Sequence, residues 1–107
     1  MRRSDIVVVA LQGDSGKPRP ALIVQADWFD ALPTAVVLPL TSTLLPVRHT
    51  RINILPTETT GLRAHSQIAI DRPQTVRREK IGQVIGRADD TTMLAVNRAL
   101  AVFLGLA

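Results

Sequence analysis

Short runs of apolar, mostly β-branched residues recur along the chain up to residue 88. Glycine, proline or small polar residues bound each run, which is the pattern of short strands separated by turns. The sequence predicts strands over residues 6–11, 21–25, 35–38, 50–55, 67–76 and 83–87. Several short strands at close spacing favour a small barrel or sandwich.

The pattern changes after residue 88, where apolar residues recur at steps of three or four and therefore share one face of a helix. These residues are Met93, Val96, Leu100, Phe103 and Leu104. Asp90 is the predicted N-cap, because its carboxylate can accept the free N–H groups of a first turn. Gly105 is expected to close the other end. The helix should pack across the sheet with Arg98 on its outer side, so the expected fold is mainly β with a C-terminal α-helix.

Length and composition limit the classes of protein that fit. A chain of 107 residues that is 46% hydrophobic suits a single domain, residues 1–107. No apolar run approaches the roughly 20 residues of a membrane-spanning helix, so no membrane association is expected. The absence of cysteine excludes disulfides and thiolate metal sites, and two histidines are too few for a convincing zinc site. We therefore expect no metal or cofactor, and a cytoplasmic location.

The chain is basic, with a formal net charge of +4 and a pI near 11.1. Eleven of the thirteen basic residues are arginine, the side chain best suited to planar oxyanions such as phosphate. A solvated basic surface would give the same balance. The charge is therefore compatible with an anionic partner without requiring one.

Polar side chains gather where the apolar runs begin or end. They form four clusters: Lys17 with Arg19, Thr41 with Ser42, Ser66 alone, and residues 71–75, which include Asp71, Arg72 and Gln74. Strand ends that meet at one face of a barrel can build a site from residues distant in sequence. Each cluster also has a purely structural interpretation: a snorkelling arginine, a hydroxyl turn, a carboxylate paired with an arginine, or an outward polar face.

Arg19 stands out because it lies between Pro18 and Pro20. Proline fixes its own φ and restricts the residue before it, so this arginine is held rigidly at the mouth of an apolar strand. A rigid charge at that place indicates that Arg19 points in a definite direction, although a strand-entry arginine with its stem on the core and its head in water would fit the same position.

Seven segments in order resemble the MazF/PemK ribonuclease toxins of bacterial toxin–antitoxin pairs, which share a small SH3-like barrel with the gyrase poison CcdB. The first is a strand after Asp5, and the last is D89-D-T-T-M93, which leads into N97-R-A-L-A-V-F-L-G-L-A107. Those between are G16-K-P-R-P-A-L-I-V24, V37-L-P-L-T-S42, G61-L-R63, S66-Q-I-A-I-D-R-P-Q-T75 and I81-G-Q-V-I-G-R87. The resemblance covers nearly the whole chain.

The resemblance implies a homodimeric, metal-independent endoribonuclease that cuts single-stranded RNA, often mRNA, at short sequences. In such enzymes the ribose 2′-OH attacks the adjacent phosphorus, leaving a 2′,3′-cyclic phosphate and a 5′-OH. It also implies an acidic antitoxin whose disordered tail folds along the toxin surface. The helix end around residues 100–106 is the expected dimer contact.

By the same resemblance, Arg19, Thr41 and Asp71 match catalytic residues. Arg19 would meet the phosphate oxygens, Thr41 would donate to the same phosphate, and Asp71 matches the aspartate proposed as general base in the Kid/PemK branch. The predicted RNA-binding residues are Lys17, Arg72, Ser42, Ser66 and Gln74.

Two departures from the family leave the acid and base open. The short loop G13-D-S-G-K-P18 lacks the glutamate that many members carry, so Asp14 is either its replacement or a turn cap. The arginine that the Kid branch places two residues before its aspartate is Ala69 here, which leaves Arg19 or Lys17 as the acid. The alternatives are a catalytically inactive RNA-binding relative and a CcdB-like gyrase inhibitor, although the tail lacks the tryptophan that CcdB-type poisons use.

Overall fold

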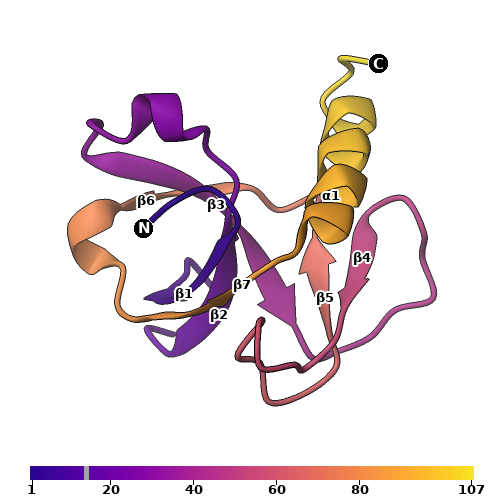
Figure 1. The fold of residues 1–107 in the computed structure, drawn as a ribbon, viewed down its shortest axis with the longest axis horizontal. Helices are drawn as coiled ribbons and strands as arrows, with labels where there is room; N and C mark the ends of the chain where they lie inside the picture. The colour runs from indigo at the N-terminus through magenta and orange to yellow at the C-terminus, as the bar shows by residue number, and fades with distance from the viewer. Residues whose placement is uncertain (14) are drawn as a thin grey trace.

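The computed structural model describes residues 1–13 and 15–107, so the predicted role of Asp14 lies outside the described residues. A curled antiparallel sheet is followed by one α-helix (Figure 1). The strands are β1 (Asp5–Ala10), β2 (Pro18–Ile23), β3 (Thr34–Thr41), β4 (Arg51–Ile54), β5 (Ser66–Ala69), β6 (Gln74–Arg77) and β7 (Val84–Arg87). Two single-turn 3-10 helices, η1 (Asp27–Phe29) and η2 (Arg78–Lys80), precede β3 and β7, and α1 spans Asp90–Phe103.

The strands run in the order β4-β5-β3-β2-β1-β7, and β6 pairs with the first half of β3. Alternate residues of β1, β2 and β3 enter two separate cores, because both faces of these strands are covered. Ile6, Leu22 and Leu38 belong to the core beneath α1, whereas Val7, Ala21 and Val37 fill the inside of the curled sheet. Burial on both faces explains why these runs are apolar throughout instead of alternating.

The strand predicted over residues 67–76 is wrong in its extent, because two strands form there. β5 ends at Ala69, a turn closed by the Arg72 N–H on the Ala69 carbonyl follows, and β6 starts at Gln74. Pro73 has no N–H for a ladder and disfavours some conformations of the residue before it, so it interrupts the strand. Both pieces still pair with one edge of β3.

Helix α1 begins one residue earlier than predicted, with Asp89 and not Asp90 as the N-cap. The Asp89 carboxylate accepts the Thr92 N–H at 2.8 Å. Gly105 has a φ of +75° and lies in the predicted closing turn, where the Leu106 N–H bonds to the Ala101 carbonyl.

Only part of the predicted apolar face of α1 is buried. Met93 and Val96 lie in the core, and Leu100 packs against it. The prediction that Phe103 and Leu104 pack on the sheet is wrong: both are exposed, because the end of the helix projects beyond the sheet (Figure 1). Exposure on a single chain is what the expected dimer contact around residues 100–106 requires. Arg98 is exposed, as predicted.

The cap at Asp89 carries a pH-dependent prediction. The hydrogen bonds from Thr92 lower the pKa of Asp89, so its ionised form stabilises the folded state. This stabilisation is present above the pKa of the unfolded chain and is lost as the pH falls through the lowered folded value, below about pH 4. We expect Asp89→Ala to lower Tm at pH 7, and the deficit to shrink on acidification towards pH 3. Thermal unfolding followed by circular dichroism at both pH values measures it; an equal deficit at both would contradict this account.

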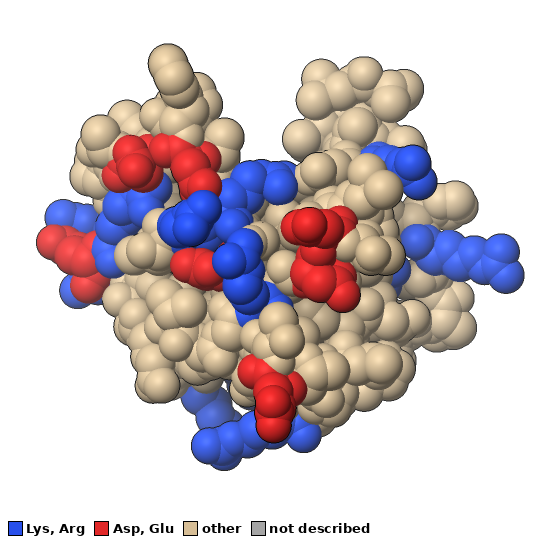
Figure 2. Space-filling model, in the orientation of Figure 1, with Lys and Arg blue, Asp and Glu red and all other residues tan. Residues whose placement is uncertain are grey.

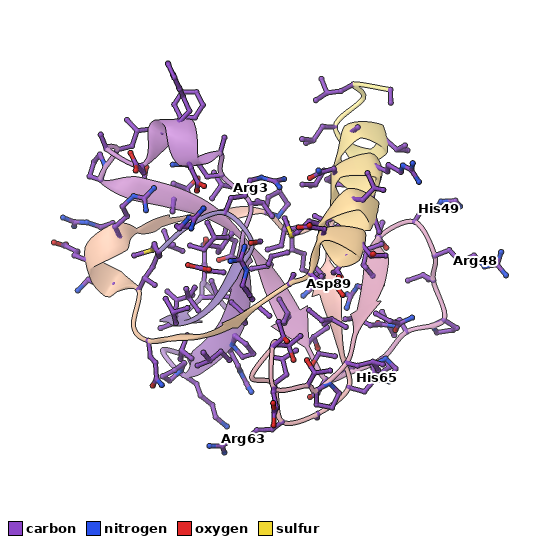
Figure 3. The ribbon with its side chains drawn as sticks, in the orientation of Figure 1. Arg3, Arg48, His49, Arg63, His65 and Asp89 are labelled. Carbon is purple, nitrogen blue, oxygen red and sulfur yellow. The ribbon has the colours of Figure 1, made fainter. Side chains whose placement is uncertain are left out.

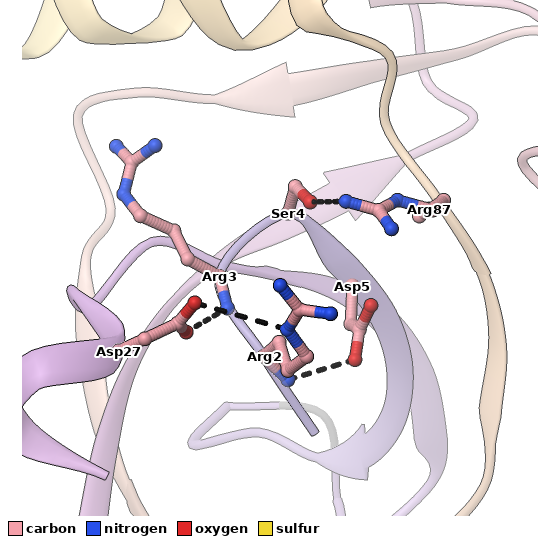
Figure 4. Close-up of polar contacts among 6 residues, drawn as sticks. All are labelled: Arg2, Arg3, Ser4, Asp5, Asp27 and Arg87. Carbon is pink, nitrogen blue, oxygen red and sulfur yellow. Dashed lines mark hydrogen bonds and ion pairs between the residues drawn. The ribbon is translucent and has the colours of Figure 1, made fainter.

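The N-terminal residues are fastened to three elements by polar contacts, and Figure 4 shows those with η1 and β7. The Arg3 N–H donates to the Asp27 carboxylate at 2.7 Å. The Arg3 side chain donates to Asn97 of α1. Ser4 is buried with a φ of +79°, and its hydroxyl accepts a bond from Arg87 of β7 at 2.8 Å. The side chains of Arg3 and Arg87 thus make contacts within the fold.

The segment 57–61 crosses β7 at close range. A Cβ on Gly86 would lie 2.2 Å from the Thr60 carbonyl oxygen, and one on Gly61 would lie 1.9 Å from that of Ile85. Thr60 is buried, and its hydroxyl donates to the Leu55 carbonyl and accepts the Thr57 N–H. Both positions thus require glycine because the two backbones touch, and residues 57–61 are held beside β7.

Candidate active site

One large cleft, of about 1190 Å³, lies beside the core that α1 covers, on the same face of β1 and β2. Val8 and its cross-strand partner Pro20 line it, two residues beyond Ile6 and Leu22 on the same strands. Six of the eight predicted site residues line this cleft: Arg19, Thr41, Ser42, Ser66, Arg72 and Gln74. The tertiary structure therefore unites clusters that are up to 55 residues apart in sequence.

Arg19 is held by the pairing of β2 with β1. The Val8 N–H bonds to the Gln83 carbonyl and so points away from β2, which makes Val8 and Pro20 a pair without mutual hydrogen bonds. The next pair, Val9 with Arg19, is then the hydrogen-bonded one. The prolines occupy positions where no ladder donor is lost, and the arginine between them has a fixed backbone and an exposed side chain.

Thr41 ends β3 directly opposite Gln67 of β5. Its hydroxyl oxygen accepts the Thr43 N–H at 3.1 Å, so the hydroxyl turn considered from the sequence does form. That bond leaves the hydroxyl proton of Thr41 available for donation. The structural and the functional interpretation of Thr41 are therefore compatible.

Ser66 is 6% exposed, and its hydroxyl donates to the Ala64 carbonyl at 3.0 Å. Its oxygen can still accept a bond from a ligand in the cleft. Gln74 accepts the Gln12 N–H at 3.2 Å, which ties the start of β6 to the chain after β1. These two side chains are thus oriented by the protein before any ligand arrives.

Sequence reasoning missed Arg63 as a site residue. It lines the cleft on the segment that follows the crossing of β7, and Figure 3 shows its side chain projecting at the lower edge of the molecule. The signal was present, since G61-L-R63 belonged to the family pattern, but no spacing rule relates residue 63 to Arg19. The cleft consequently has three arginines: Arg19, Arg63 and Arg72.

Two predicted site residues do not line the cleft. Asp71 lies on the exposed turn between β5 and β6, next to Arg72, which does line it, and not within a strand as expected. Lys17 is exposed and precedes β2. Among the described residues that line the cleft, none is Asp or Glu.

The surface charge is mixed on the face drawn in Figure 2, where basic and acidic side chains alternate. Two arginines outside the cleft have structural partners: Arg78 donates to the Leu32 carbonyl, and Arg77 pairs with Glu79 at 2.8 Å. Arg51 is buried. The cleft arginines have no ion pair with another described residue. The cleft therefore carries three positive charges that no ion pair among the described residues neutralises.

In the described part of the chain, no three His, Asp or Glu side chains come together as metal ligands. No helix among residues 1–13 and 15–107 is long and apolar enough to cross a membrane.

The chain is similar to known proteins in sequence and in fold. Residues 2–104 match the model of the PemK-like, MazF-like toxins of type II toxin–antitoxin systems. The chain is 44% identical to a probable endoribonuclease MazF of Mycolicibacterium smegmatis, covering 100% of this chain and 99% of that protein.

Solved structures share the fold. An endoribonuclease in complex with its cognate antitoxin from a mycobacterial species has a TM-score of 0.84 at 23% identity, over 100% of this chain and 97% of that one. Mycobacterium tuberculosis toxin MazF-mt6 has a TM-score of 0.83 at 24% identity, over 96% and 98%. The expected fold, mainly β with a C-terminal helix in a small MazF-like barrel, is confirmed. The family match over nearly the whole chain, together with the 44% identical relative, shows that this protein belongs to the PemK/MazF family of type II toxin–antitoxin toxins.

Proposed function

We propose that this protein is an endoribonuclease toxin that cleaves single-stranded RNA, including mRNA, at short sequences and without a metal ion. The observation that carries the proposal is the cleft, which combines three arginines with the hydroxyls of Thr41, Ser42 and Ser66 and has no described acidic residue in its lining. Arginine and hydroxyl donors are the groups that a phosphodiester requires. The relative at 44% identity carries the name of a probable endoribonuclease, which supports the same reaction.

The proposed chemistry uses the substrate's own nucleophile. The ribose 2′-OH attacks the adjacent phosphorus and loses its proton to a base, while the 5′-oxygen leaves and takes a proton from an acid. Negative charge builds up on the non-bridging oxygens, where the Arg19 guanidinium and the Thr41 hydroxyl stabilise it. Because both donors are positioned by strand pairing, little reorganisation is needed in the transition state.

The remaining cleft residues bind the RNA strand in this proposal. Arg72 and Arg63 contact phosphates, and Ser42, Ser66 and Gln74 offer hydrogen bonds to sugar or base edges. Lys17, just outside the lining, adds charge near the entrance of β2. The acid is Arg19 or Lys17.

Asp71 is the proposed base, and its position on the exposed turn beside the cleft makes this the most testable of the assigned roles. If Asp71 removes the 2′-OH proton, Asp71→Asn should lower the rate and flatten the acidic side of the rate–pH profile of cleavage. Steady-state cleavage of a short RNA between pH 4.5 and 8 measures both. An unchanged profile would assign the base elsewhere.

Incubation of the purified protein with a long single-stranded RNA in EDTA tests the function itself. We expect cuts at a short repeated sequence, with cyclic phosphate on one new end and 5′-OH on the other. A DNA strand of the same sequence should bind and stay intact, because it lacks the 2′-OH. RNA that stays intact with folded, antitoxin-free protein would reject the proposal.

The proposed partners are a cognate antitoxin and a second copy of the chain. One related structure is an endoribonuclease bound to its cognate antitoxin, and another is a MazE–MazF complex of Deinococcus radiodurans, with a TM-score of 0.77 at 19% identity over 100% of this chain and 97% of that one. An acidic antitoxin segment would be attracted to the arginines of the cleft, which it would block against RNA.

The dimer contact in this proposal is the projecting end of α1, where Phe103, Leu104 and Leu106 are exposed. Figure 2 shows a notch between this end and the projection that carries η1, whose Trp28 is 88% exposed. Apolar surface on both sides of a notch is more than a monomer normally leaves in water.

Charge placed at that contact should separate the subunits. Leu104→Glu is expected to convert a dimer into a species near the 11.6 kDa chain mass, because a carboxylate would be buried without a partner. Leu55→Glu, which alters an exposed leucine after β4, should leave the dimer intact. Sedimentation velocity distinguishes the species, and an unchanged mass for Leu104→Glu would place the contact elsewhere.

A further inference from the structure

Gln67 is a buried amide that none of the assigned roles explains. It is 4% exposed and makes three hydrogen bonds. Its Oε1 accepts the Leu45 N–H at 2.9 Å, and its Nε2 donates to the Leu45 carbonyl at 3.0 Å. One side chain therefore satisfies both backbone groups of a single loop residue, as a neighbouring strand would.

The loop that Gln67 holds has little else to keep it in place. All of residues 42–49 are exposed, including the apolar side chains of Leu44, Leu45 and Val47. Within the described chain, only three hydrogen bonds attach residues 42–49: the two to Gln67, and the Thr43 N–H on Thr41. A segment with so few contacts depends on each of them for its conformation.

The held segment forms part of the cleft wall. Thr41, Ser42 and Thr43 line the cleft, and Thr41 lies directly opposite Gln67 in the β3–β5 pairing. Residues 41–45 are thus fixed at one end by strand pairing and at the other by the Gln67 amide. The path of Ser42 and Thr43 along the cleft follows from these two attachments.

The same amide reaches the other wall. The third bond of Gln67 runs to Asn53 Oδ1 at 3.1 Å, and His65 Nε2 lies 3.1 Å from that oxygen. His65 directly follows Arg63 and Ala64 of the cleft lining and directly precedes Ser66. Gln67 therefore links the loop after β3 with the segment that enters β5.

We propose that Gln67 is a positioning residue that sets the conformation of residues 42–45 and thereby the base preference of RNA cleavage. The inference rests on the proposed ribonuclease function. Thr41 keeps its place through strand pairing, so the reacting phosphate is still held when Gln67 is lost. What changes is the wall that meets the neighbouring bases, which affects discrimination and KM more than kcat.

Gln67→Met tests this inference, because it keeps the length of the side chain and removes all three bonds. Gln25→Met is the matched control: Gln25 also bonds three backbone groups, those of Phe29, Thr34 and Val36, in a region outside the cleft. For each protein, cut sites are mapped on one long RNA, and KM and kcat are measured for a favoured and a second-ranked sequence.

For Gln67→Met we expect the ratio of kcat/KM between the two sequences to fall about tenfold, mainly through KM, with kcat within about threefold. Gln25→Met should keep the wild-type ratio. A ratio within twofold of wild type in Gln67→Met would overturn the proposal, as would an equal change in both variants.

Hydrogen exchange separates this inference from the ribonuclease proposal. The amides of Thr43 and Leu45, the two hydrogen-bonded N–H groups of this loop, should exchange about tenfold faster in Gln67→Met than in wild type, with β3 unchanged, whether or not RNA is cut. Unchanged exchange would overturn the clamp even if cleavage is confirmed. If Gln67→Met does not fold, Leu45→Pro replaces it, because proline at this exposed position removes the N–H that donates to Gln67. The proposal then requires the altered sequence preference and the faster exchange of the Thr43 amide in Leu45→Pro.

Discussion

Arg19→Ala is expected to reduce RNA cleavage by about 10³-fold or more and to abolish toxicity, while the protein stays folded. A guanidinium held rigidly at the reacting phosphate stabilises charge that develops only in the transition state, and a 10³-fold loss corresponds to about 4 kcal/mol. Arg19 has an exposed side chain on a backbone fixed by its pairing with Val9. Its removal therefore takes away the charge and little of the packing.

Arg98→Ala is the matched control, because Arg98 is an exposed arginine on α1 outside the cleft lining. Arg98→Ala removes the same side chain and the same charge as Arg19→Ala, and it should cleave RNA at the wild-type rate. Arg19→Lys should recover only part of the loss, since an ammonium cannot reproduce the planar two-donor geometry. Single-turnover cleavage at saturating enzyme isolates the chemical step. A rate for Arg19→Ala within tenfold of wild type would remove Arg19 from the catalytic residues.

Thr41→Ala and Thr41→Val are both expected to slow cleavage by about 10²-fold or more, the usual effect of losing one transition-state donor. Valine keeps the shape of threonine at the end of β3, so a shared loss assigns the effect to the hydroxyl and not to packing. Thr41→Ser keeps the oxygen that accepts the Thr43 N–H and should stay within about tenfold of wild type. A loss under threefold in Thr41→Val would make the hydroxyl purely structural.

These two predictions are separable from the Gln67 inference by the parameter that changes. Loss of Arg19 or Thr41 should lower kcat for every RNA sequence alike, because the phosphate is common to all of them. Loss of the Gln67 clamp should redistribute the cut sites while kcat persists. Suppose that Arg19 or Thr41 variants lose rate without changing their cut sites, and that Gln67→Met changes its cut sites without losing rate. The two results together would assign chemistry and base recognition to different residues of one cleft.

The corrections to the predicted elements have local physical causes. The predicted strand 67–76 is split at residues 70–73 because of Pro73. Proline ends a strand only where the neighbouring strand needs an N–H donor at that position, and the sequence does not show where that is. The N-cap shifted from Asp90 to Asp89 because adjacent aspartates are equally good caps in sequence, and the backbone decides which carboxylate faces the free N–H groups. Phe103 and Leu104 have the right period for a buried face, but the helix extends past the surface that would cover them.

The sequence by itself determined the class of fold, the succession of strands, the terminal helix and the family, because periodicity, turn residues and ordered motifs are properties of neighbouring positions. It also indicated Arg19 through its place between two prolines, and Thr41 through the resemblance to the family. Only the tertiary structure decided that six clustered polar residues share one cleft, that Arg63 joins them while Asp71 lies on the turn outside the lining, and that Gln67 supports the loop. Those facts depend on strand register and on how the sheet curls, which bring together residues whose separation along the chain carries no information about their distance in space.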